Sequence, residues 1–112
     1  MDSILNLDVK IKENVNNTLD SISKELNENW TRNAKAEVSI KDSGSEQYVF
    51  NYKNGNQNNS IYLIERDGEL QTTNIVPADG ISSIPISECN DMLRKFEDEV
   101  LNKTNLKYSL HN

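Results

Sequence analysis

The apolar residues of this 112-residue chain fall in periodic groups that predict an α+β fold. Over residues 4–30 they recur every three or four positions, which is typical of the buried face of an α-helix. This stripe consists of Ile4, Leu7, Ile11, Val15, Leu19, Ile22, Leu26 and Trp30. Residues 5–11 also alternate between apolar and polar, as a half-buried strand does. From Val15 onward only the helix fits. Because the helical stripe stays in phase from residue 4, we favour helix over strand for residues 4–11.

Four short strands are expected in the middle of the chain. Residues 36–40 and 48–52 alternate, and the turn sequence Asp-Ser-Gly-Ser at 42–45 predicts a hairpin between them. Residues 53–60 are expected to form a polar loop. The runs 61–66 and 69–76 are joined by Asp67 and Gly68, residue types that favour the positive φ values of a tight hairpin turn. We therefore expect an antiparallel meander with one covered face.

A C-terminal helix is predicted after the proline-containing segment 77–86. Ser87 is the expected N-cap, and Cys89, Leu93, Phe96 and Val100 recur at steps of four, three and four. Residues 106–110 alternate again and predict a short final strand. The expected fold is a single α+β domain over residues 1–112. It has an N-terminal amphipathic helix, a four-stranded antiparallel β-meander, a C-terminal helix and a possible short terminal strand.

Acidic residues are concentrated in one third of the chain. Residues 65–99 carry the whole formal net charge of −6, and the remaining residues balance. Such a region repels nucleic-acid phosphates and attracts a basic protein surface. We therefore predict a protein partner with a basic surface and no direct nucleic-acid binding. The predicted partner-binding residues are Glu65, Asp67, Glu69, Asp91, Glu97, Asp98 and Glu99. The alternative is ordinary solubilising charge on exposed faces.

Catalytic chemistry finds little support in the residues. Cys89, the only cysteine, lies at a helix start, where the helix dipole favours a thiolate. It also lies on the apolar stripe, beside Glu88 and Asp91, which disfavour that charge. The only histidine, His111, is next to the C-terminus, where chains usually fray. We therefore expect Cys89 to pack in the core, and we expect no catalytic residue, no cofactor and no metal site.

The chain also indicates a compartment. No stretch approaches the roughly 20 apolar residues that a bilayer span needs, and the N-terminal residues lack the pattern of a signal peptide. A single cysteine fits a reducing environment. We expect a cytoplasmic protein with no membrane partner. Trp30 closes the N-terminal stripe, so we expect its ring to be buried where helix and sheet meet.

Three functions are compatible with these observations. A helix, a meander and a second helix in a small acidic protein resemble many bacterial immunity proteins, antitoxins and secretion chaperones. The resemblance implies a non-enzymatic protein that inhibits or escorts another protein, and this is the function we favour. The second hypothesis is a Cys89-dependent enzyme or redox regulator. The third is a self-associating structural protein that forms a homodimer through its N-terminal helix.

Overall fold

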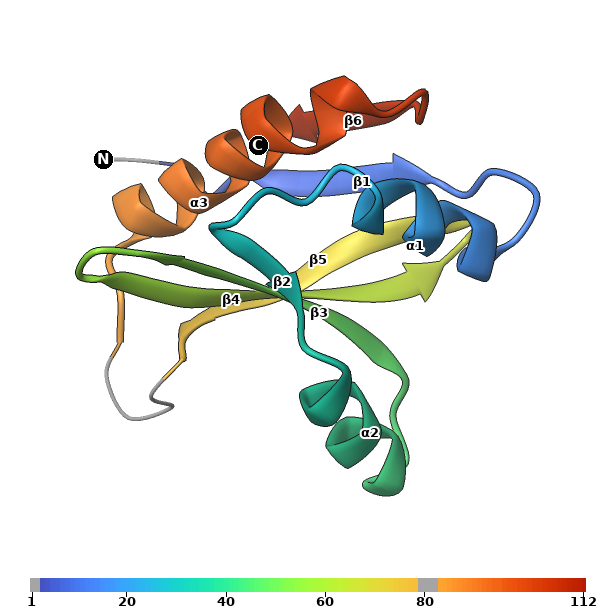
Figure 1. Cartoon of the computed structure of the whole chain (residues 1–112), viewed down its shortest axis with the longest axis horizontal. Helices are drawn as coiled ribbons and strands as arrows, with labels where there is room; N and C mark the ends of the chain where they lie inside the picture. Colours follow the sequence, from blue (N-terminus) through green and yellow to red (C-terminus); the bar gives the residue numbers. More distant parts are fainter. Residues whose placement is uncertain (1–2, 79–82) are drawn as a thin grey trace.

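The computed structural model describes residues 3–78 and 83–112 of the chain (Figure 1). In chain order its elements are β1 (Asn6–Lys10), α1 (Val15–Ser23), β2 (Trp30–Arg32), α2 (Ala34–Asp42), β3 (Gln47–Asn54), β4 (Gln57–Arg66), β5 (Glu69–Pro77), α3 (Ile86–Glu99), the 3₁₀ turn η1 (Leu101–Lys103) and β6 (Tyr108–His111). The predicted α+β class is confirmed. Within the described residues, however, the sheet has six strands rather than four, and there are three α-helices rather than two.

All six strands form one antiparallel sheet in the order β2-β3-β4-β5-β1-β6. The first strand therefore lies inside the sheet, between β5 and β6. Figure 1 shows α3 and α1 lying along the same side of the strands, and α2 set apart from them beside β2 and β3. The 79–82 part of the predicted connecting segment lies outside the described residues.

The core lies between one face of the sheet and the helices α1 and α3. Cross-strand neighbours project to the same face, and the facing pairs Val9–Leu70, Phe50–Ile61 and Trp30–Tyr52 are all buried. The helices complete this core with the buried side chains Leu19, Ile22, Met92, Leu93 and Phe96. The stripe predicted for α3 is therefore confirmed at Leu93, Phe96 and Val100, whereas Cys89 is only half-buried.

The favoured helix over residues 4–11 is wrong, because Asn6–Lys10 form strand β1. Leu7 and Val9 are fully buried, whereas Ile4, which belongs only to the helical stripe, is 59% exposed. Glu13 has a φ of 68°, which a helix cannot accommodate, and Asn14 then caps α1 by accepting from the Asn17 N–H. The continuous helix on which the dimerisation hypothesis was based is therefore not formed. Apart from Ile4, its apolar residues pack in or against the chain's own core, from β1, α1, β2 and the segments between them.

The strand predicted at 36–40 is also wrong, because Ala34–Asp42 form helix α2. Asn33 caps the helix by accepting from the Ala36 N–H. At the other end, Gly44 has a φ of +99° and donates its N–H to Lys41 O, while the Ser45 N–H is bonded to Ile40 O. This is a Schellman motif, so the predicted turn at 42–45 ends a helix rather than a hairpin strand.

Trp30 begins β2 rather than ending a helix, but its predicted burial is confirmed, since it is 2% exposed. Its ring centroid lies 4.8 Å from that of Tyr52 and 5.1 Å from that of Phe96. Tilted aromatic contacts at such distances are favourable beyond the area that they bury. The tryptophan thus joins the edge strand β2 to the helix α3.

The hairpin predicted around Asp67 and Gly68 is confirmed. Both residues have positive φ values, 53° and 78°, and Arg66 pairs with Glu69 across the two-residue turn. The polar loop predicted at 53–60 is instead mostly strand, because β3 and β4 pair as far as Asn54 and Gln57.

Helix α3 and strand β6 were both predicted, but the residue that begins the helix was not. Helix α3 exists as expected, but its N-cap is Pro85, without a side-chain hydrogen bond, rather than Ser87. The short final strand is confirmed as β6. His111 does not fray, because it pairs with Asn6 of β1.

Candidate functional site

The predicted partner-binding residues of the β4–β5 hairpin lie together at its turn. Glu65 and Asp67 are exposed, and within the described residues neither side chain forms a hydrogen bond or an ion pair. Glu69 is half-buried and accepts a hydrogen bond from Gln71 Nε2 at 3.2 Å. The Ile11 N–H donates to Gly68 O at 3.1 Å, so the turn is held against the end of β1. This turn therefore presents two free carboxylates on a fixed backbone.

The three consecutive acids at the end of α3 point in different directions. Neighbouring residues on an α-helix project about 100° apart. Glu97 accepts from Tyr108 Oη at 2.8 Å, on the β6 side of the helix. Glu99 accepts from Asn27 Nδ2 at 2.9 Å and from Trp30 Nε1 at 3.3 Å. Only Asp98 is exposed. The helix therefore offers one free carboxylate here rather than a row of three.

The hydrogen bond with Glu97 and the burial of the ring both affect the phenol of Tyr108. Burial first, and then the hydrogen bond with Glu97, raise the pKa of Tyr108 to about 12. The phenol consequently stays protonated over the ordinary pH range and remains a donor to the carboxylate. Glu97 thus joins α3 to β6 instead of facing solvent as a free charge.

Asp91 lies on the outer side of α3 and is paired with a base. Its Oδ2 atom is 3.2 Å from Nζ of Lys95, which lies four residues further along the same helix. Lys95 also donates to Gln57 Oε1 at 2.7 Å. The seven predicted residues are therefore divided between a turn and three sides of a helix, and the structure does not gather them into one surface.

The sequence did not predict a hollow between β5 and α3, which forms where Asn90 of α3 holds the chain before β1. Backbone pairing of β1 with β5 covers only Asp8–Lys10. Before that, the Leu5 N–H donates to Asn90 Oδ1 at 2.9 Å, and Asn90 Nδ2 donates to Ser3 O at 2.7 Å. The amide of Asn90, which is 4% exposed, thus takes the place of a neighbouring strand and draws the chain toward α3.

Strand β5 bends away from β1 on the other side of the same gap. Leu63 pairs with Thr72 and Tyr62 with Asn74, so Thr73 is an extra residue in β5. Such a bulge bends the strand that carries it. The Thr72 hydroxyl bridges the gap, accepting from the Leu7 N–H at 3.1 Å and donating to Leu7 O at 3.3 Å. The two strands therefore separate beyond Leu7.

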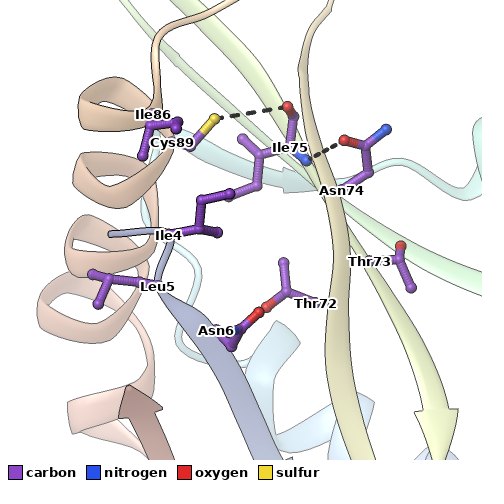
Figure 2. Close-up of a pocket in the computed structure, with 9 residues that line it drawn as sticks. All are labelled: Ile4, Leu5, Asn6, Thr72, Thr73, Asn74, Ile75, Ile86 and Cys89. Atoms are coloured by element: carbon purple, nitrogen blue, oxygen red, sulfur yellow. Dashed lines mark hydrogen bonds between the residues drawn. The ribbon is translucent and has the colours of Figure 1, made fainter. Parts of the chain in front are cut away.

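The resulting hollow has a volume of about 220 Å³. Figure 2 shows Ile4 and Ile75 lying between β5 and α3, with Cys89 and Ile86 on the helix above them. The Ile75 N–H is bonded to Asn74 Oδ1 at 3.0 Å, and Ile75 O lies 4.0 Å from Cys89 Sγ. The hollow can hold an apolar side chain next to these backbone groups.

Cys89 is poorly suited to nucleophilic chemistry in this hollow. Burial, and to a lesser extent the charge of Glu88, raise the pKa of the Cys89 thiol. A thiol is nucleophilic only as the thiolate, so a raised pKa lowers its reactivity at neutral pH. The only histidine, His111, lies on β6, where its Nε2 atom is 2.6 Å from Asp8 Oδ2. No three imidazole, thiol or carboxylate groups of the described residues are grouped to hold a metal ion.

The sequence contained one signal that could have located the hollow. Asn90 is a polar residue on the buried face of α3, next to Leu93, and buried amides are almost always hydrogen-bonded. The pattern could not say that its partners are Ser3 and Leu5, 87 and 85 residues away.

Comparison of the chain with protein-family models, with curated proteins and with solved structures gave no match in any of the three. In the part of the chain that the structure describes, no helix is long and apolar enough to cross a membrane.

Proposed function

We propose that this protein is a non-enzymatic binding module that engages another protein with a basic surface. The observation that supports the proposal is the excess of acidic residues in the segment 65–99. Within the described residues, three carboxylates of this segment are exposed and have no ion-pair partner: Glu65, Asp67 and Asp98. Carboxylates of this kind attract a basic surface over several ångströms. They increase the rate of association and select the partner more than they add to affinity.

The β4–β5 turn is a favourable place for such contacts because its backbone is already ordered. The turn is closed by the Arg66–Glu69 pair and is bonded to Ile11. A preordered surface loses little conformational entropy when it binds. Glu65 and Asp67 can therefore meet a basic partner without a change in the backbone.

The proposed surface is smaller than the seven residues that the sequence suggested. Glu97 and Glu99 accept hydrogen bonds from Tyr108 and Trp30, and Asp91 is paired with Lys95. Glu97, Asp98 and Glu99 consequently do not form a row that could replace the phosphates of a nucleic acid. We propose contact through Glu65 and Asp67 at the turn, with Asp98 as a separate exposed charge on α3. A partner of the nuclease-toxin type is one case within this class.

The test is a comparison of two variants with the same change in charge. The first combines Glu65→Lys, Asp67→Asn and Asp98→Lys, where asparagine retains the left-handed conformation of the turn. The matched control combines the exposed residues Asp20→Lys, Glu28→Lys and Asp42→Asn. Tagged wild-type protein is used to capture proteins from extract of the native host, and a captured protein is then purified for binding kinetics.

The proposal expects the first variant to associate with the purified partner at least tenfold more slowly than the control variant does. It also expects the wild-type association rate to fall as salt is added, because salt screens the attraction. Equal association rates for the two variants would show that these three carboxylates do not form the contact. A captured partner without a basic surface would contradict the proposal as well.

A further inference from the structure

Two adjoining hollows at one end of the sheet are lined by lysines. One has a volume of about 280 Å³ and lies beside Ile11 and Leu106, and the other, of about 210 Å³, lies beside Thr104 and Ser21. Lys12, Asn105 and Leu106 line both, so the two hollows lie next to each other. We call the lysines around them the lysine patch: Lys10, Lys12, Lys24, Lys103 and Lys107.

The fold brings these lysines together from separate segments and fixes their backbone positions. The Lys10 N–H donates to Lys107 O at 2.8 Å, which joins β1 to the residue before β6. The Lys12 N–H donates to Thr18 Oγ1 at 2.8 Å, which joins the residue after β1 to α1. Lys24 is the C-cap of α1, and Lys103 ends η1. The patch is therefore a feature of the folded chain and not of a local basic sequence.

The patch is strongly positive for a protein with a net charge of −6. All five lysines are exposed, and none has an ion-pair partner within 4.0 Å among the described residues. Glu25 is the only acid that lines the two hollows, so their lining carries a net charge of +4. The β4–β5 turn, with Asp67 and Glu69, borders the patch on the Ile11 side. The positive area is thus bounded rather than extended.

The two hollows differ in chemistry, and the difference selects the ligand. Asn105 and Leu106 line both hollows, and the larger adds the apolar side chain of Ile11. The smaller adds Lys24, Lys103 and the polar residues Ser21 and Thr104, whose hydroxyls already donate to Asn17 O and Leu101 O. An apolar side chain flanked by carboxylates matches this combination. A nucleic acid fits less well, because a long polyanion that reached beyond the lysines would meet the acids of the neighbouring turn. We propose that the lysine patch binds an acidic segment of a protein that carries an apolar side chain among its carboxylates.

This site is separate in charge and in residues from the acidic contact proposed above, so either can fail without the other. The test uses a fluorescent peptide of repeated Glu-Glu-Leu units as the probe. The patch variant combines Lys12→Glu, Lys24→Glu and Lys103→Glu. The control combines Lys35→Glu, Lys41→Glu and Lys53→Glu, three exposed lysines elsewhere with the same total change in charge. Binding is measured by fluorescence anisotropy at low salt.

We expect the affinity for the peptide to fall at least tenfold in the patch variant and less than threefold in the control variant. The NMR signals of the Ile11 and Leu106 amides should shift with this peptide, and should shift much less when its leucines are replaced by serine. Equal losses in the two variants would overturn the inference, because they would indicate attraction by net charge alone. Tighter binding of a single-stranded oligonucleotide than of the peptide, or no saturable binding of the peptide, would overturn it too.

Discussion

Replacement of Asn90 by alanine tests the account of the gap between β1 and β5. The amide makes two hydrogen bonds, to the Leu5 N–H and to Ser3 O. Each is worth about 1 kcal/mol net, and an orphaned buried group costs a further 1 to 3 kcal/mol. Ser3 is exposed and Leu5 is half-buried, so water can reach the freed groups and the orphan penalty stays near the lower limit. Alanine is the better helix former by roughly 0.5 kcal/mol, which offsets part of the loss. We expect a net destabilisation of about 2.5 kcal/mol.

The assay is urea unfolding, combined with hydrogen exchange at the Leu5 amide. For a slope near 2 kcal/mol per molar urea, a loss of about 2.5 kcal/mol lowers the midpoint by roughly 1.2 M. Asn16→Ala is the matched control, since it makes the same change at an exposed position of α1. It should be neutral or slightly stabilising. If Asn90→Ala unfolds at the same urea concentration as Asn16→Ala, and the Leu5 amide exchanges no faster, the side chain does not hold the two strands apart as argued.

Three further changes test other parts of the structure. Gly44→Ala should lower the free energy of unfolding by about 1 kcal/mol, because a φ of +99° favours glycine. Gly44→Asn should lower it less, and equal losses for the two variants in thermal unfolding would refute this. The hydrogen bond with Asp8 raises the pKa of His111, so its stabilisation is present below about pH 6.5 and is lost as pH rises through the folded-state pKa. His111→Gln should therefore lower stability at pH 5.5 and leave it nearly unchanged at pH 9, and an equal loss at both would contradict that sign. Because burial raises the pKa of the Cys89 thiol, iodoacetamide at pH 7 should label it more slowly in the native protein than in denaturant. Equal labelling rates would contradict this.

The sequence was most informative where local chemistry decides the structure. The Asp67-Gly68 turn needs two positive φ values, and only a few residue types supply them, so the hairpin could be identified from two letters. The stripe of α3 was equally clear, because Leu93, Phe96 and Val100 have no competing strand pattern. In both cases the signal and the structure involve the same few residues.

The errors arose where two local patterns fitted the same residues. Residues 36–40 alternate between apolar and polar as a strand does. Helix α2 buries none of its side chains completely, so its sequence has no helical repeat of apolar residues that could have identified it. Its caps, Asn33 and Gly44, decided the outcome. At residues 5–11 the alternation was correct and the helical stripe was a coincidence. The choice depended on β5 and β6, which supply hydrogen bonds from distant parts of the chain.

The candidate sites were harder to predict because they are built from distant residues. The acids of α3 were located on the correct helix, but their hydrogen-bond donors, Trp30 and Tyr108, come from β2 and β6. The lysine patch could not be seen in the sequence at all. Its members are as far apart as Lys10 and Lys107, and only the pairing of β1 with the chain before β6 brings them together.

The interior position of β1 has a consequence for how the protein is made. Residues 6–10 leave the ribosome well before the strands that flank them, which include residues 69–71 and 108–111. Until translation has passed His111, the backbone groups on one side of β1 lack their partners, and a nascent chain is an open template for wrong pairing. Completion of the sheet therefore has to wait for β6, and contacts between residues so far apart in the sequence form slowly.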